Sequence, residues 1–172
     1  MVILITGASH TGKTLLAQKM LERYRFPYLC IDHLKMGLIR SGRTNLTPED
    51  DDALVDCLWP IVREIIKTAI ENEQNLIVEG CYVPFDWRSD FTARYLRSIR
   101  FICLAMSDDY IAAHASQIAA HASDIEARQD DSYCTVDWLL RENRRVREGF
   151  LRAGEPVAQI ESDYTSTIEG LL

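Results

Sequence analysis

Short apolar runs recur along the chain, separated by longer stretches in which apolar and polar residues mix. The first run is Val2–Ile5, and others follow at 28–31, 76–80, 101–105 and 157–160. The runs are mainly apolar at consecutive positions, which is typical of strands buried on both faces of a parallel sheet. Because longer stretches of helical character separate them, the pattern predicts an α/β fold in which helices cover both faces of a five-stranded parallel sheet.

One intervening stretch carries clear helix-start signals. Thr47-Pro48-Glu49-Asp50 supplies a cap residue, a proline suited to the first helical position and acidic residues, so a helix is expected from there to about residue 73. Trp59-Pro60 predicts a kink or a break in this helix, because proline lacks a backbone N–H group.

The connection from 107 to 150 is long and polar for a link between two strands, so it predicts an inserted helical element. Its second half is rich in arginine. A helix from 136 to 152 would gather Leu139, Val146 and Phe150 on one side. The opposite side would then carry Arg141, Arg145 and Arg152.

The first apolar run leads directly into a segment with the glycine and lysine spacing of a phosphate-binding loop. Glycines let the backbone curl so that amide groups point at phosphate oxygens, and the following helix adds its positive end. Lys13 is expected to reach the β- and γ-phosphates, and the hydroxyl of Thr14 is expected to ligate Mg²⁺. The predicted nucleotide site consists of Gly7, Ala8, Ser9, His10, Thr11, Gly12, Lys13, Thr14 and Leu15.

Two acidic residues end other predicted strands, Asp32 after the second and Glu79 in the third. Ligands of open parallel sheets bind beyond the carboxyl ends of the strands. The phosphate loop, Asp32 and Glu79 are therefore expected to converge on one cleft.

Composition narrows the choice of function. The chain has 172 residues, 47% of them hydrophobic, which favours one domain with a proper core. Its formal charge of −7 argues against a general nucleic-acid binder.

Five cysteines without a C-x-x-C pair favour a reducing cytoplasm over a disulfide framework. The first apolar run lacks a basic leader, so no secretory signal is expected, and no run is long enough to span a membrane.

The phosphate loop, Asp32, Glu79 and the arginine-bearing insertion together resemble the small P-loop kinases, such as adenylate kinase and shikimate kinase. The segment 76–84 is similar to the third-strand region of the 2-phosphoglycerate-kinase-like group, and zeta-toxin-like phosphotransferases are also similar. The resemblance implies a three-layer P-loop NTPase fold, ATP with Mg²⁺ as donor, and a helical lid at about 123–150 within one domain over 1–172. Such a lid predicts that nucleotide orders residues near 123–136.

Asp32 is expected to orient or deprotonate the acceptor hydroxyl, with helix capping before His33 as the alternative. Glu79 stands where many P-loop proteins carry an aspartate, and it is expected to hold the Mg²⁺ shell or the acceptor. The alternative for Glu79 is a solvated strand end. His10 could touch the γ-phosphate, but exposure without a role is the simpler interpretation.

Arg141 and Arg145 are spaced so that both could close on the transferring phosphate. The alternative is a solvated arginine face partnered by Glu142 and Glu148. Arg128 is a further candidate for lid closure. Surface charge is the interpretation for Arg144 and Arg147.

Lys35, Arg40 and Arg43 follow Asp32 and suggest an acceptor that carries its own negative charge, with a plain exposed helix face as the alternative. Tyr82 is expected to contact the acceptor as well. Asp86, Trp87 and Arg88 could complete the opposite wall, although a tryptophan at such a place is more often a packing anchor.

The favoured function is an ATP-dependent transfer of the γ-phosphate to a hydroxyl or phosphate of a small metabolite. The alternative is a nucleotide-binding regulatory module or a slow NTPase. The sequence lacks the Asn-Lys-x-Asp segment and the Asp-x-x-Gly motif of GTPase switches.

Overall fold

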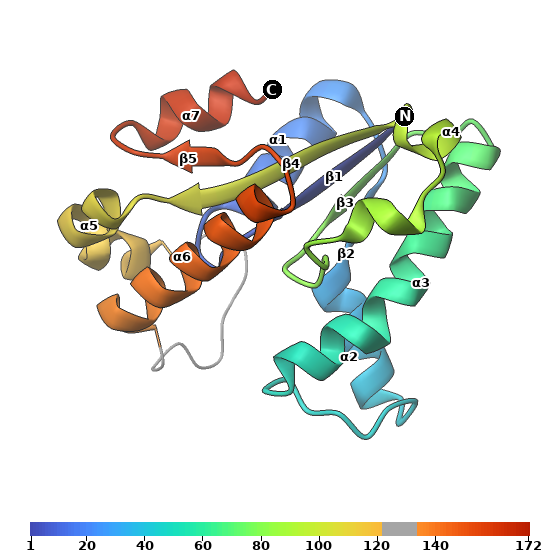
Figure 1. The fold of residues 1–172 in the computed structure, drawn as a ribbon, viewed down its shortest axis with the longest axis horizontal. Coiled ribbons are helices and arrows are strands. Elements are labelled where there is room, and N and C mark those ends of the chain that lie inside the picture. Colours follow the sequence, from blue (N-terminus) through green and yellow to red (C-terminus); the bar gives the residue numbers. More distant parts are fainter. Residues whose placement is uncertain (122–133) are drawn as a thin grey trace.

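The computed structural model describes residues 1–121 and 134–172. Within these residues five parallel strands form one sheet in the order β2-β3-β1-β4-β5 (Figure 1). The predicted five-stranded parallel sheet is thus confirmed, and its strand order is new information. The strands are β1 Val2–Gly7, β2 Tyr28–Cys30, β3 Leu76–Glu79, β4 Ile99–Met106 and β5 Ala158–Ile160.

Helices connect the strands and cover the sheet. They are α1 Lys13–Tyr24, α2 Ile31–Arg40, α3 Asp51–Glu71, α4 Ala93–Leu96, α5 Asp108–Ala120, α6 Val136–Arg152 and α7 Tyr164–Gly170, with a 3-10 turn, η1, at Trp87–Asp90. Among the described helices, none is both long enough and apolar enough to cross a membrane.

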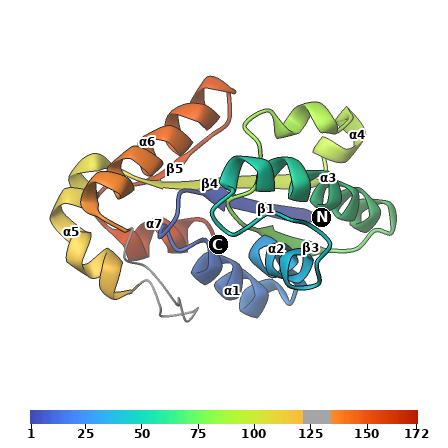
Figure 2. The same ribbon diagram turned by 90° about the horizontal axis from the view of Figure 1, so that it is seen from below.

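The central strand β1 separates two core clusters by simple alternation of its side chains. Val2 and Leu4 pack with α3 and α6, whereas Ile3 and Ile5 pack with α1 and α7. Figure 2 shows α3 and α6 on one side of the sheet and α1 and α7 on the other. All four of these β1 side chains are fully buried, as the apolar run predicted.

Helix α3 differs from its prediction at two points. It begins at Asp51 and not at 47, because the Asp50 carboxylate accepts hydrogen bonds from the backbone N–H and the hydroxyl of Thr47 and holds 47–50 as a turn. The expected break at Trp59-Pro60 does not occur. Pro60 lies inside a continuous helix and is exposed, while Trp59 is buried.

Helix α6 has the bounds that its periodicity predicted, and Leu139, Val146 and Phe150 are buried. Asn143, also fully buried, ties it to the sheet. Its side-chain oxygen accepts from the backbone N–H of Met106 at 2.8 Å. Helix α6 is therefore part of the layer that covers β4. Residues 122–133, which include the first part of the lid predicted at 123–150 and most of the segment 123–136 expected to respond to nucleotide, lie outside the described residues.

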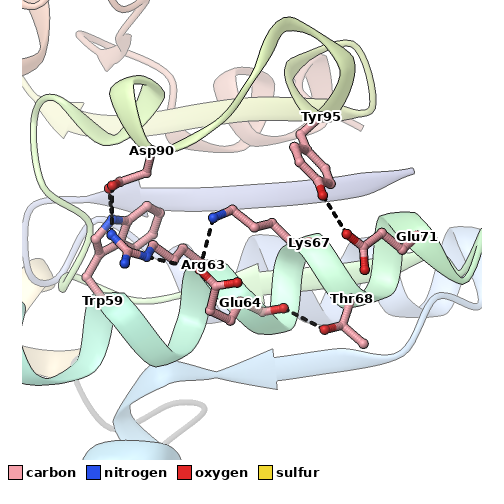
Figure 3. Close-up of polar contacts among 8 residues, drawn as sticks. All are labelled: Trp59, Arg63, Glu64, Lys67, Thr68, Glu71, Asp90 and Tyr95. Atoms are coloured by element: carbon pink, nitrogen blue, oxygen red, sulfur yellow. Dashed lines mark hydrogen bonds and ion pairs between the residues drawn. The ribbon is translucent and has the colours of Figure 1, made fainter.

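The segment between β3 and β4 is fastened to α3 by polar contacts (Figure 3). The Asp90 carboxylate accepts from the indole N–H of Trp59 and from the guanidinium of Arg63, both at 2.7 Å. Tyr95 donates to Glu71 further along the same helix. These contacts hold in place the chain that leaves the carboxyl end of β3.

Candidate active site

The phosphate loop connects β1 to α1, and its two glycines have backbone shapes that other residues avoid. Gly7 has φ 142° and Gly12 has φ 81°. A Cβ atom at Gly7 would lie 2.1 Å from the Leu104 carbonyl oxygen, and one at Gly12 would lie 1.7 Å from the Tyr164 hydroxyl. The loop thus combines left-handed backbone with close approach of β4 and α7, and only glycine fits at both positions.

Lys13 is the first residue of α1 and is buried. Its ammonium donates to the Ala8 carbonyl at 2.8 Å, which folds the side chain over the loop. Burial alone would lower the pKa of Lys13, but Cys81, Glu79 and Asp32 together raise it above its usual value. The group at the loop is therefore a stable cation, as a phosphate site requires.

Glu79 ends β3 and is only 1% exposed, so the alternative of a solvated strand end is wrong. It pairs with Ile5 of β1 on one side and with Cys30 of β2 on the other. Its Oε1 accepts from the Tyr28 hydroxyl at 3.1 Å and faces the Thr14 hydroxyl at 3.4 Å. Burial raises the pKa of Glu79, while Lys13, Cys30 and Tyr28 oppose that rise.

The Thr14 hydroxyl and the Glu79 carboxylate are oxygen ligands of the kind that suits a magnesium ion. Mg²⁺ prefers hard oxygen ligands and is usually held by one or two carboxylates together with substrate phosphates. A buried carboxylate facing a hydroxyl at the phosphate loop supplies such a donor pair. Both residues predicted as metal ligands therefore lie together.

Asp32 lies in the first turn of α2, whose cap residue is Cys30, so Asp32 does not cap the helix as the alternative interpretation required. Its Oδ1 forms an ion pair with Lys35 at 2.7 Å. The charge of Asp32 also contributes to raising the pKa of Lys13 and of Glu79, because Asp32 lies near both groups. His33, its neighbour, is exposed.

Lys35 is the other main feature on this side of the site. Its ammonium donates to the Tyr82 hydroxyl at 2.8 Å, and Tyr82 is buried. Burial opposes the charge of Lys35, but Asp32 outweighs it and raises the pKa of the lysine. Arg40 and Arg43, predicted to bind the acceptor with Tyr82, are exposed.

Trp87 and Arg88, in the segment after β3, do not line the acceptor site as the sequence suggested. Trp87 is fully buried in the core, so it is a packing anchor and does not contact the acceptor. Arg88 pairs with the buried carboxylate of Glu155 through both its Nε and Nη2 atoms. These two side chains hold the segment in place and do not line the site.

The arginines of α6 have local partners. Arg145 donates from two nitrogens to Glu142, each at 2.9 Å, which is the partner that the alternative interpretation named. Arg141 is exposed one turn earlier. Arg144 and Arg147 pair with Asp108, in keeping with surface charge. Arg128 lies outside the described residues.

No motif in the sequence marks Tyr28, Cys30 or Cys81 as site residues. Tyr28 pairs with Ile77, two residues before Glu79, so its side chain lies on the same face of the sheet as the carboxylate. Burial and the nearby Glu79 raise the pKa of Cys30 to about 12, so its thiol stays protonated. The register of β2 on β3, which no local sequence signal specifies, brings Tyr28 and Cys30 beside Glu79.

His10, in the loop, has φ 65°, and its ring lies edge-on to Trp138 of α6 with ring centres 6.1 Å apart. His10 is half-buried, so the exposure predicted for it is only partial.

A wide groove of about 1080 Å³ lies between α3 and the loop that joins α1 to β2, away from the phosphate loop. None of the residues that line this groove belongs to the predicted site.

No protein-family model matches the sequence, and no curated protein matches it significantly. The fold, however, is shared with solved kinases. A shikimate kinase from Bacteroides thetaiotaomicron is 14% identical with a TM-score of 0.58, over 99% of this chain and 95% of that one. A sugar kinase from Janibacter sp. HTCC2649 is 17% identical with a TM-score of 0.57, over 99% and 91%.

A gluconokinase from Sinorhizobium meliloti 1021 is 14% identical with a TM-score of 0.53, over 98% of this chain and 87% of that one. At such low identities the likeness concerns the fold. The chain has the α/β fold of the small P-loop kinases, as its sequence predicted.

Proposed function

We propose that the protein is an ATP-dependent kinase that transfers the γ-phosphate to a small, hydroxyl-bearing metabolite. The observation that carries the proposal is the convergence of four groups at the carboxyl edge of the sheet: the phosphate loop, the buried cation of Lys13, the Thr14 and Glu79 oxygens, and Asp32. A donor site next to a candidate proton acceptor favours phosphoryl transfer over nucleotide binding alone.

In the proposed step, the acceptor hydroxyl attacks the γ-phosphorus of ATP. A new O–P bond forms while the bond to the β–γ bridging oxygen breaks, and that oxygen leaves with ADP and keeps the electron pair. The hydroxyl proton passes to the Asp32 carboxylate. The loop amides and Lys13 bind the phosphate oxygens, and this positioning and charge neutralisation supply most of the rate.

Thr14 and Glu79 would hold Mg²⁺, which when bound neutralises charge on the β- and γ-phosphate oxygens. Arg141, Arg145 and Arg128 are proposed to approach the transferring phosphate. For Arg145 this requires exchanging its contact with Glu142 for a phosphate contact. A bidentate guanidinium contact of this kind is available to phosphate as well as to carboxylate.

Arg40 and Arg43 support an acceptor with its own negative charge, because both are exposed cations close in sequence to Asp32. Three of the proteins that share the fold are a gluconokinase, a sugar kinase and a shikimate kinase. Hydroxylated acids and sugars are therefore the first acceptors to examine.

The test is ADP production from ATP and Mg²⁺ over a panel of hydroxylated acids, sugars, sugar phosphates, nucleosides and nucleoside monophosphates. Lys13→Ala should abolish acceptor-dependent turnover, whereas Lys19→Ala, in the same helix, should leave it unchanged. Acceptor-dependent ADP formation that is lost only in Lys13→Ala supports the kinase. Tight ATP binding with turnover that no acceptor stimulates would instead favour a regulatory nucleotide-binding module.

A further inference from the structure

Lys35 joins Asp32, on the same helix, to Tyr82 of the segment after β3. Asp32 and Lys35 are three residues apart on α2, so they lie on the same face of the helix, and their charged atoms are 2.7 Å apart. The ammonium also donates to the Tyr82 hydroxyl at 2.8 Å and lies 5.1 Å from the centre of the Tyr82 ring. The Lys35 side chain is only 13% exposed.

Burial of the lysine, whose partner Asp32 is 39% exposed, distinguishes this ion pair from one between two surface side chains. A lysine at a helix surface moves among many rotamers and holds a carboxylate only loosely. Here Tyr82 fixes the ammonium, and Tyr82 is itself only 6% exposed on the segment that leaves β3. The lysine is thus held from the sheet side, and it in turn can hold one carboxylate oxygen of Asp32 in a fixed place.

The contacts of Lys35 also argue against the role that its sequence position suggested. An ammonium has three N–H donors, and Asp32 and Tyr82 engage two of them. The negative charge of Asp32 already neutralises the positive charge of Lys35. Recognition of an anionic acceptor is therefore better assigned to the exposed Arg40 and Arg43 than to Lys35.

We infer that Lys35, supported by Tyr82, is a positioning residue that orients the Asp32 carboxylate toward the acceptor hydroxyl. The inference rests on the proposed kinase function. The ion pair occupies Oδ1 of Asp32, so Oδ2 is the oxygen that receives the hydroxyl proton. A carboxylate held in this way needs no reorganisation when the acceptor binds, which is the advantage of a preorganised site.

A double-mutant cycle tests the inference, because a residue that acts through Asp32 loses its effect when Asp32 is neutralised. The variants are Lys35→Met, Asp32→Asn and the two combined. ADP formation at saturating ATP and Mg²⁺ is measured with the acceptor identified by the panel, and in parallel with water as the only acceptor. Binding of ATP and thermal unfolding of each variant report on folding.

Lys35→Met should lower kcat by about tenfold and Asp32→Asn by about a hundredfold or more, the range expected for a general base. In the Asp32→Asn background, Lys35→Met should change kcat by less than about twofold. Tyr82→Phe should lower kcat less than Lys35→Met does. Lys67→Met is the matched control, because Lys67 forms a 2.9 Å ion pair with Glu64 at the same three-residue spacing on α3. The kcat of the Lys67→Met variant should equal that of the wild type.

An equal loss from Lys35→Met in both backgrounds would overturn the inference, since Lys35 would then act independently of Asp32. So would an unchanged kcat in Lys35→Met alongside a large loss in Asp32→Asn. Failure of the proposed function gives a different result: either the wild type has no turnover, or Asp32→Asn retains full turnover, and both of these overturn the kinase mechanism together with the inference.

Discussion

Glu79 illustrates how a single side chain depends on its neighbours for its chemistry. A glutamate at this depth would ordinarily be protonated or paired, because burial of an isolated carboxylate is costly. Here Tyr28, Cys30 and Lys13 counter the upward shift of its pKa. The carboxylate therefore has both the donors and the nearby positive charge that a metal-binding role requires.

Glu79→Gln tests that role, because it keeps the side-chain volume while it removes the charge. We expect the Mg²⁺ concentration for half-maximal ADP formation to rise by at least about tenfold, in line with the loss of a charged ligand. Binding of ATP in the absence of Mg²⁺ should change little. An unchanged Mg²⁺ midpoint in Glu79→Gln would show that Glu79 does not bind the metal.

Asp108, in the first turn of α5, gives a pH-dependent prediction. Its hydrogen bond from Arg144 lowers the pKa of Asp108 below the ordinary range. The carboxyl therefore binds its proton more weakly in the folded chain, so it stabilises the fold above about pH 4 and loses this contribution as the pH falls through the lowered value.

Asp108→Asn should lower the free energy of unfolding at neutral pH by no more than about 1 kcal/mol, since the pair is partly solvated. In urea unfolding experiments the gap between variant and wild type should narrow as the pH is lowered from about 7 to about 3. Asp109→Asn, at the exposed neighbouring residue, is the control. A gap that is constant with pH would contradict the role of the ion pair.

At the scale of elements, α6 and α3 show when local sequence signals suffice. The period of Leu139, Val146 and Phe150 predicted α6 because one side of this helix packs on the sheet and the other carries charges. The start of α3 was mispredicted because the cap signal at Thr47 is satisfied by Asp50 within a turn. Local hydrogen bonding of this kind competes with helix formation.

Gly149 of α6 lies against Phe85 in the segment after β3. A Cβ atom there would lie 2.4 Å from the ring of Phe85, which packs edge-on against Phe150 at 4.9 Å between ring centres. Gly149→Ala should lower the free energy of unfolding by about 1–3 kcal/mol, the usual cost of overpacking.

Gly37→Ala is the matched control for that substitution. Gly37 is also inside a helix, and a Cβ atom there meets nothing within 4 Å. Its replacement should raise the free energy of unfolding by about 0.5–1 kcal/mol, because alanine loses less backbone freedom in a helix. Chemical denaturation of both variants measures the difference, and equal effects at the two positions would rule out the Phe85 contact as the cause.

At the scale of the molecule, sequence reasoning identified the sheet, the phosphate loop and the edge at which Asp32 and Glu79 meet. Each of these depends on residues adjacent in the chain or on the general geometry of parallel sheets. Strand order and register depend on pairing between distant segments, so the contacts of Tyr28 with Glu79 and of Lys35 with Tyr82 could not be predicted.

The central place of β1 has a consequence for how the chain is made. Val2 pairs with Leu76 on one side and with Ile99 on the other, so both partners of the strand leave the ribosome long after it does. Until then β1 has no neighbouring strand to pair with, and the phosphate loop that follows it lacks the contact of Gly7 with Leu104 of β4. Such distant pairing slows folding and exposes an aggregation-prone strand during synthesis. The β4 frame on which the nucleotide site rests is therefore absent until residue 106 has been synthesised, although the phosphate loop itself ends at residue 14.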